Sequence, residues 1–150
     1  MASTEANAEA APQANANFSG TWRLEKNDEN FDKFWCEMGV NYFVRKMMGM
    51  SRPTTIIKQE GNKFDITNQS MKGSDTQTFT AGEEYDFSNP WTKEINRMSP
   101  AWEGDKLVIK PVEKPDEQPT VSRHLEGEYL VLTMKKGDVA TNRYYKKVET

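Results

Sequence analysis

Residues 18–49 read FSGTWRLEKNDENFDKFWCEMGVNYFVRKMMG, and the spacing of the apolar residues changes once within them. In residues 18–24 apolar and polar side chains alternate, which predicts a half-buried strand. From Phe31 onwards the apolar residues recur with the spacing of an amphipathic helix. Because Gly39 interrupts this pattern and Gly49 ends it, we expect one strand followed by two short helices joined by a tight turn.

The two helices are expected within residues 28–49, with Asn27 or Asp28 as the N-cap of the first. After Pro53 the helical spacing gives way to short runs of alternating residues separated by Gly, Asn or Pro turns. One strand, a helical hairpin and a run of up-and-down strands predict an all-β fold, an antiparallel β-barrel or β-clam with a helix-turn-helix lid. The strands after the helices are expected near residues 54–59, 63–68, 76–80, 83–88, 92–98, 106–110, 120–125, 128–134 and 139–147.

Length, charge and cysteine content limit the kinds of protein that the chain can be. The chain has 150 residues, enough for one domain of ordinary size, and its net charge of −3 lacks the basic excess of a nucleic-acid-binding protein. Cys36 is the single cysteine, so no internal disulfide is expected. No apolar run marks a signal peptide or a membrane span. The sequence therefore predicts a cytoplasmic, monomeric protein with a disordered tail over residues 1–17 and one barrel domain over residues 18–150.

Two arginines in the C-terminal part are placed unusually. Strand alternation puts Arg123 on the same face as the apolar Val121 and Leu125, and it puts Arg143 on the same face as Tyr145. A buried guanidinium needs a partner, and its planar fork fits a carboxylate. The pattern allows two interpretations: the arginines and the tyrosine converge in a cavity as an anion site, or each arginine points outward into solvent.

Several short motifs follow one another along the chain: residues 18–24, Asn30-Phe31-Asp32, Met38-Gly39-Val40, Arg45-Lys46, Pro53-Thr54-Thr55-Ile56-Ile57, Gly82-Glu83-Glu84-Tyr85-Asp86, Lys106-Leu107-Val108 and Arg143-Tyr144-Tyr145. In this order they resemble the intracellular fatty-acid-binding proteins, and the resemblance covers roughly residues 18–148. It implies a ten-stranded antiparallel up-and-down β-barrel with a water-containing cavity. It also implies non-covalent binding and intracellular transport of a long-chain fatty acid.

The resemblance assigns roles to individual residues. It implies that Arg123, Arg143 and Tyr145 hold the carboxylate of the ligand. Family members that bind retinol place glutamine at the arginine positions, so both arginines favour an acid over an alcohol. Retinoic and bile acids remain alternative ligands, since they also present a carboxylate. The residues that it places in the cavity or at its portal are Phe31, Trp35, Met71, Asp86, Leu132 and Met134.

The chain departs from the family pattern in three places. The segment from Leu24 to Asn30 is one residue longer than usual, which should alter the start of the first helix and leave the pocket unchanged. Three prolines, at positions 111, 115 and 119, fall where the family has a hairpin and should shorten its strands. The tail of residues 1–17 has no counterpart in the family.

The second helix raises the question of a membrane contact. It combines Arg45 and Lys46 with Phe43, Met47 and other apolar residues. Such a basic and apolar surface near a portal could contact anionic membranes transiently during ligand transfer. Alternatively, the apolar residues pack on the barrel and the charges are solvated.

Other function classes find less support in the sequence. No catalytic motif, metal-ligand cluster or phosphate-binding loop is present, so we expect no enzyme activity, no metal and no cofactor. A secreted lipocalin also begins with Gly-x-Trp, but the helical pattern directly after the first strand is against it. The remaining alternative is a structural barrel that docks on a membrane or a partner and binds its ligand incidentally.

Overall fold

The structure is a computed structural model that describes residues 14–71, 73–89 and 93–148. In these residues it contains the predicted helical hairpin and the predicted series of strands. The helices are α2 (Phe31–Glu37) and α3 (Tyr42–Met50). The strands are β1 (Gly20–Asn27), β2 (Thr54–Glu60), β3 (Lys63–Ser70), β4 (Gly73–Thr80), β5 (Tyr85–Ser88), β6 (Ile95–Glu103), β7 (Lys106–Pro111), β8 (Thr120–Glu126), β9 (Tyr129–Lys136) and β10 (Val139–Lys147).

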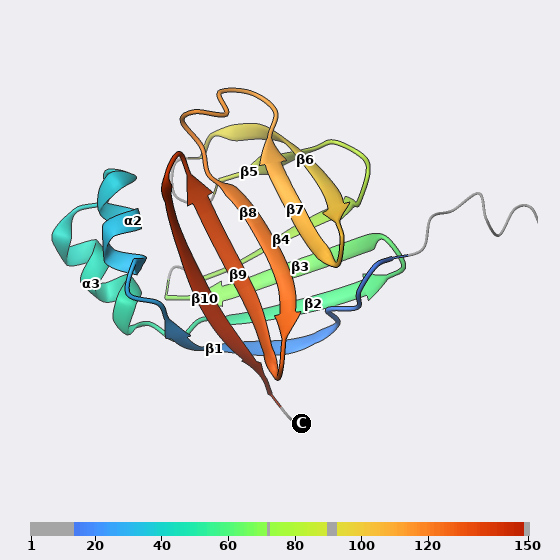
Figure 1. Ribbon diagram of the computed structural model, residues 1–150, viewed down its shortest axis with the longest axis horizontal. Helices are drawn as coiled ribbons and strands as arrows, with labels where there is room; N and C mark the ends of the chain where they lie inside the picture. The colour runs from blue at the N-terminus through green and yellow to red at the C-terminus, as the bar shows by residue number, and fades with distance from the viewer. Residues whose placement is uncertain (1–13, 72, 90–92, 149–150) are drawn as a thin grey trace, which may run out of the picture.

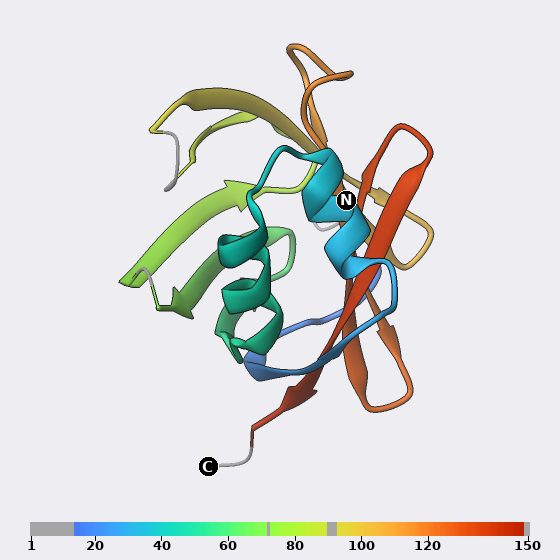
Figure 2. The same cartoon turned by 90° about the vertical axis from the view of Figure 1, so that its left-hand side faces the viewer.

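The ten strands form one antiparallel sheet that curls into a barrel. The strand order is β4-β3-β2-β1-β10-β9-β8-β7-β6-β5, so every strand except β1 and β10 pairs only with its neighbours in sequence. Strands β4 and β5 are the two ends of the sheet and share no ladder of backbone hydrogen bonds. The two helices lie together at one open end of the barrel (Figures 1 and 2). The predicted ten-stranded barrel with a helix-turn-helix lid is confirmed.

Aromatic side chains pack together around Phe18, which precedes β1 on the side where the chain enters the barrel, and the helices lie at the other end (Figure 1). The fully buried Phe18 lies 5.8 Å from Trp102, measured between ring centroids, and Trp102 lies 6.2 Å from Phe64. Phe64 in turn stacks on Phe79 of the next strand. Stacked and tilted aromatic pairs of this kind add stabilisation beyond the area they bury. Side-chain packing therefore closes this end of the barrel.

The residues just before Phe18 contact the barrel. The side chain of Asn15 donates to the carbonyl of Gly104 at 2.6 Å, and the side chain of Gln59 donates to the carbonyl of Ala16 at 2.7 Å. Residues 14–17 are thus attached to the barrel, although the sequence places them in the tail. The rest of the predicted tail, residues 1–13, lies outside the described residues.

The first helix begins differently from the prediction. Its N-cap is Asn30, whose side chain makes no capping hydrogen bond. The predicted cap Asp28 instead accepts hydrogen bonds from the Thr141 hydroxyl at 2.5 Å and from the backbone N–H groups of Asn142 and Asn30. Its carboxylate ties the segment between β1 and α2 to β10. Within the described residues, neither helix is long and apolar enough to cross a lipid bilayer.

Prolines modify the second half of the sheet. Strand β6 continues through Pro100, which pairs with Ile109 of β7, whereas the sequence predicts a strand near residues 92–98. Residues 90–92 lie outside the described residues. A proline lacks the N–H needed for a ladder bond, so a strand passing through it is hard to predict. Strand β7 ends at Pro111 and β8 begins at Thr120, as the prolines of this segment predict.

Candidate ligand-binding site

The three residues predicted to hold a carboxylate lie on neighbouring strands of one barrel wall. Arg143 of β10 pairs with Leu132 of β9, and Leu132 pairs with Arg123 of β8. Directly paired residues share a face, so both arginines point to the same side of the sheet, about 10 Å apart at two strand spacings. Arg123 is 6% exposed and Tyr145 is 4% exposed. The structure therefore excludes the outward interpretation of the arginines.

Arg123 is a buried cation without an anion. Its Nη1 has no hydrogen-bond partner among the described residues. Burial lowers the pKa of its guanidinium, while the nearby hydroxyl groups of Tyr85 and Tyr145 act in the opposite direction. A buried guanidinium without a charged partner is costly, and a carboxylate would supply both the charge and the acceptors.

Arg143 has more interactions with neighbouring side chains than Arg123 has. Its Nε donates to the side-chain oxygen of Asn27 at 2.7 Å, and its guanidinium lies over the ring of Phe31, 4.9 Å from the centroid. Burial lowers the pKa of Arg143, and the positive charge of Arg52 lowers it further. With Arg52 nearby, the site carries excess positive charge on the side of the helices.

The extra residue between Leu24 and Asn30 is absorbed by a bulge in β1. Leu24 pairs with Tyr145 and Lys26 pairs with Tyr144, so two steps along β1 match one step along β10. After the bulge Asn27 is opposite Arg143, where its side chain accepts the Arg143 hydrogen bond. One residue of this segment therefore contacts the predicted site, and the expectation that the longer segment leaves the pocket unchanged stays a prediction.

Four of the predicted lining residues lie beside the arginines or under the helices. Leu132 and Met134 face inward from β9, on the face that carries Arg143. Phe31, the first residue of α2, is buried, and the ring of Trp35 from the same helix meets it edge-on with the ring centroids 6.3 Å apart. The indole nitrogen of Trp35 is buried and has no hydrogen-bond partner among the described residues.

The other two predicted residues are placed differently. Met71 is 65% exposed in the turn between β3 and β4, which opens toward the helices (Figures 1 and 2), so it belongs to the rim. Asp86 lies on the outer face of β5 and forms an ion pair with Arg97 at 3.1 Å. The prediction of Asp86 as a cavity or portal residue is corrected, because the inward residue at this position of β5 is Tyr85.

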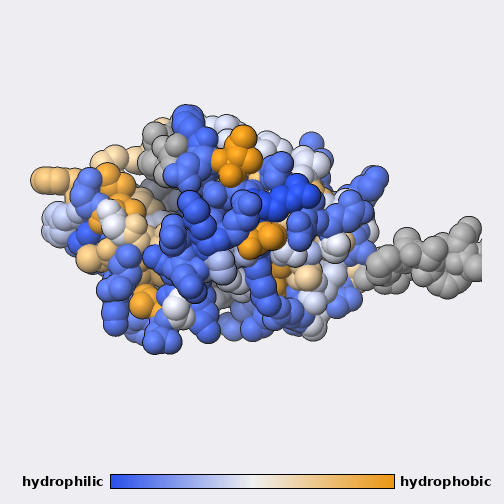
Figure 3. Space-filling model, turned by 90° about the horizontal axis from the view of Figure 1, so that it is seen from above, coloured by the Kyte–Doolittle hydropathy of each residue, from blue (hydrophilic) through white to orange (hydrophobic). Residues whose placement is uncertain are grey.

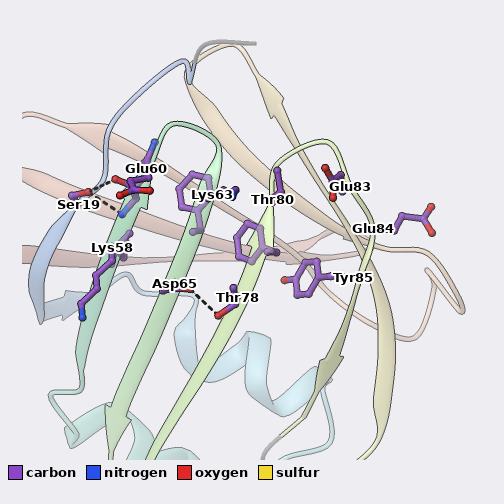
Figure 4. A pocket seen from close by; sticks show the side chains of 14 residues that line it. Ser19, Lys58, Glu60, Lys63, Asp65, Thr78, Thr80, Glu83, Glu84 and Tyr85 are labelled. Atoms are coloured by element: carbon purple, nitrogen blue, oxygen red, sulfur yellow. Dashed lines mark hydrogen bonds between the residues drawn. The ribbon is translucent and has the colours of Figure 1, made fainter. Parts of the chain in front are cut away.

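Sequence reasoning did not assign Tyr85 to the site. Its side chain extends from β5 toward β4 across the unpaired seam of the barrel (Figure 4). The ring stacks on Phe79 at 4.7 Å between centroids, and the hydroxyl donates to the side-chain oxygen of Gln77 at 2.6 Å. Burial raises the pKa of Tyr85 to about 12, so the phenol remains neutral at physiological pH. The sequence would have pointed to Tyr85 if the alternation along β5 had been taken with Tyr85, and not Asp86, facing inward.

A cleft of about 820 Å³ lies over β2, β3 and β4 and reaches this seam. Charged side chains such as Lys58, Lys63 and Glu60 stand along it, and Thr78 donates a 2.8 Å hydrogen bond to Asp65 within it (Figure 4). None of the three residues predicted to hold a carboxylate lines this cleft. The cleft and the predicted carboxylate site therefore have different lining residues, although Tyr85, which interacts electrostatically with Arg123, belongs to the cleft.

Comparison with known proteins supports the family that the sequence motifs suggest. The model of the family described as "Lipocalin / cytosolic fatty-acid binding protein family" matches residues 19–147. The chain is 32% identical over 129 residues to fatty acid-binding protein homolog 5 of Caenorhabditis elegans, covering 85% of this chain and 94% of that protein. It is 35% identical over 134 residues to the intestinal fatty acid-binding protein of Bos taurus, covering 87% and 98%.

The fold agrees as well. The crystal structure of Echinococcus granulosus fatty-acid-binding protein 1 superimposes with a TM-score of 0.74 at 27% identity, covering 88% of this chain and 98% of that one. Ten strands, two helices and an inward arginine pair thus coincide with similarity along nearly the whole barrel. The chain belongs to the lipocalin / cytosolic fatty-acid binding protein family.

Proposed function

We propose that this protein binds one long-chain fatty acid non-covalently inside the barrel and carries it through the cytoplasm as a monomer. The carboxylate is held by Arg123, Arg143 and Tyr145. The observation that carries this proposal is Arg123, a fully buried guanidinium whose Nη1 lacks a partner among the described residues. The names of the relatives, which are fatty acid-binding proteins, support the same ligand class.

The acyl chain and the carboxylate have different roles in this proposal. Burying a methylene group gains about 0.8 kcal/mol, so a chain of about fifteen methylenes offers on the order of 12 kcal/mol before ordering costs. The chain therefore supplies most of the affinity. The arginines orient the ligand and select an acid, because only an anion compensates their buried charge.

The first experiment identifies what the barrel contains. The purified protein is extracted with organic solvent, the extract is analysed by mass spectrometry, and a delipidated sample is titrated with oleate, retinoic acid and a bile acid. We expect long-chain fatty acid at one equivalent and the tightest binding for oleate. An empty extract together with no binding of oleate would contradict the proposal, and tighter binding of another acid would replace the ligand class.

A second experiment tests the role of the arginines. Replacing Arg143 with glutamine should weaken binding of oleate much more than binding of oleyl alcohol, because only the acid uses the charge of Arg143. Equal losses for the two ligands would show that Arg143 shapes the cavity without selecting the acid.

We further propose that α3 contacts anionic membranes during ligand transfer. This helix has no buried residue, and Tyr42, Phe43, Met47 and Met50 are 58%, 79%, 51% and 78% exposed. Apolar side chains gather at the end of the molecule that bears the helices (Figure 3). The alternative in which these residues pack on the barrel therefore finds no support. An exposed apolar patch of this kind is typical of an interaction surface.

The two basic residues predicted for this contact differ in their availability. Arg45 forms an ion pair with Asp32 at 2.9 Å and donates to the carbonyl of Val40. Lys46 is exposed and lies 5.3 Å from the ring centroid of Tyr42. The positive charge available to a lipid surface on this helix is therefore that of Lys46.

The membrane proposal is tested by the rate of transfer of a fluorescent fatty acid to vesicles. We expect the rate to rise with the fraction of anionic lipid, and we expect Phe43→Ser to reduce it. Leu125→Ser, at an exposed apolar residue of β8, is the matched control. Rates indifferent to anionic lipid would rule out the contact. Clustering of vesicles by ligand-free protein would favour the alternative of a structural barrel with an incidental ligand.

A further inference from the structure

The inner wall formed by β2, β3 and β4 changes from apolar to polar along its length. The register pairs Phe79 with Phe64, then Gln77 with Ile66, and then Asp75 with Asn68. Alternation puts Asp75 and Gln77 on the same face as the buried Phe79. Near the turn that opens toward the helices, the inward side chains are therefore polar, whereas those farther from it are aromatic.

These polar groups are only partly satisfied within the protein. The side-chain oxygen of Gln77 accepts the hydroxyl of Tyr85 at 2.6 Å, which leaves its two amide hydrogens without a partner among the described residues. Thr55 donates to the side-chain oxygen of Asn68 at 2.9 Å. The carboxylate of Asp75 has no hydrogen bond or ion pair with any other described side chain, and partial burial raises its pKa.

The Gln77–Tyr85 pair is adjacent to the proposed carboxylate site. Tyr85 of β5 interacts electrostatically with the buried Arg123 of β8, three strands away in the sheet order. Because Gln77 and Tyr85 are joined by a hydrogen bond and Gln77 lies on the inner face of β4, the pair is placed to contact the chain of a ligand inside the barrel. A plain alkyl chain there would displace water from the Gln77 amide without replacing its hydrogen bonds, and such unsatisfied groups weaken binding.

We propose that the cavity is adapted to an oxygenated long-chain acid, whose hydroxyl or keto oxygen along the chain is bound by the Gln77–Tyr85 pair. The inference rests on the proposed fatty-acid function and specifies its ligand class. The Gln77 amide donates to the chain oxygen. A hydroxyl on the chain can in turn donate to the Tyr85 oxygen or to the carboxylate of Asp75. The polar side chains of this wall would form no hydrogen bond with a saturated chain. With an oxygenated chain they contribute to the affinity and to the preference for the oxygenated acid.

The competing explanation is structural, because the Tyr85–Gln77 hydrogen bond also links β4 to β5 across the unpaired seam. A purely structural bond would affect every ligand equally. A ligand contact would affect the ratio of two affinities, that for a hydroxylated acid and that for the matching plain acid. The ratio is therefore the quantity to measure.

The experiment titrates delipidated full-length protein with stearate and with hydroxystearates whose hydroxyl lies near the carboxylate, in mid-chain or at the far end. For the wild type we expect at least one hydroxystearate to bind about fivefold to tenfold more tightly than stearate, in line with one or two net hydrogen bonds. Gln77→Leu should abolish this ratio. Thr76→Val, on the outer face of the same strand, should preserve it.

The outcomes separate the two proposals. If stearate binds and no hydroxystearate is preferred, or if the preference survives in Gln77→Leu, the oxygenated-ligand inference is overturned while the carrier function stands. If neither acid binds, both fail. Should Gln77→Leu not fold, Tyr85→Phe removes only one hydroxyl and is expected to reduce the same ratio.

Discussion

Arg123 should lower the stability of the empty protein while it enables ligand selection. We predict that Arg123→Met makes the delipidated protein more stable. The side chain is 6% exposed and its Nη1 has no partner among the described residues, so the folded state carries an uncompensated buried cation. Replacing a buried ion pair with apolar side chains of similar size often stabilises a protein by about 1–4 kcal/mol, and we expect a gain of this order for an unpaired buried arginine. For a barrel of this size that corresponds to a rise of roughly 3–10 °C in Tm.

The same substitution should remove the preference for acids. Hydrogen bonds to charged groups contribute about 1.5–3 kcal/mol, so affinity for oleate should fall about tenfold to a hundredfold. Affinity for oleyl alcohol should change little, because the alcohol does not use the charge. Thermal melts of the delipidated protein and titrations with both ligands measure the two effects separately.

Arg143→Met is the matched comparison. Arg143 donates to Asn27 at 2.7 Å and lies over Phe31, so its removal breaks interactions that exist without ligand. We therefore expect Arg143→Met to leave Tm unchanged or to lower it, while it weakens oleate binding as Arg123→Met does. A delipidated Arg123→Met protein that melts below the wild type, or equal losses of acid and alcohol affinity, would refute the reasoning about Arg123.

Three further predictions follow from individual contacts. The pKa of Tyr85 is about 12 in the folded protein against the usual 10.0, so the tyrosine of the unfolded chain ionises first as the pH rises. The free energy of unfolding should therefore fall between pH 10 and pH 12, by at most about 1.4 kcal/mol per pH unit. Urea denaturation should show a smaller fall for Tyr85→Phe than for the wild type. Asp28→Ala removes the acceptor of three hydrogen bonds and should cost about 1–3 kcal/mol in the same assay, whereas the exposed Glu29→Ala should cost little. Lys46→Ala should reduce the salt-sensitive part of vesicle binding, measured by co-sedimentation, whereas the double change Arg45→Ala with Asp32→Ala should leave it nearly unchanged, because that ion pair carries no net charge.

The periodicity of the sequence predicted the strands and helices because it records which face of each element is buried. It could not predict contacts that depend on a distant strand. Asp28 looks like a helix cap in sequence, yet it bonds to Thr141 and Asn142 of β10, which only the closed barrel brings near. The strand predicted near residues 92–98 continues through Pro100 for a related reason, since pairing with the neighbouring strand decides whether a missing N–H matters.

The site was predictable to the extent that the family resemblance fixed the phase of alternation. Spacing alone places Arg143 and Tyr145 together but leaves open whether they face inward, because both phases have the same period. On β5 the matching to the family selected Asp86, whereas the structure exposes Asp86 and turns its neighbour Tyr85 inward. Gln77 was missed because an isolated polar residue in a strand resembles a solvated one until its pairing with Ile66 places it on the inner wall.

The carboxylate site and the helical lid share a support. Asn27 holds Arg143 and is followed directly by Asp28, which anchors the start of α2 to β10. Phe31, the first residue of α2, lies under the same arginine. A carboxylate that draws Arg143 toward the cavity must therefore pull against Asn27 and Phe31, so the ligand and the first turn of α2 are mechanically connected. The Nη1 of Arg123 has no such partner among the described residues, and this difference explains why the two arginines should respond differently to the same substitution.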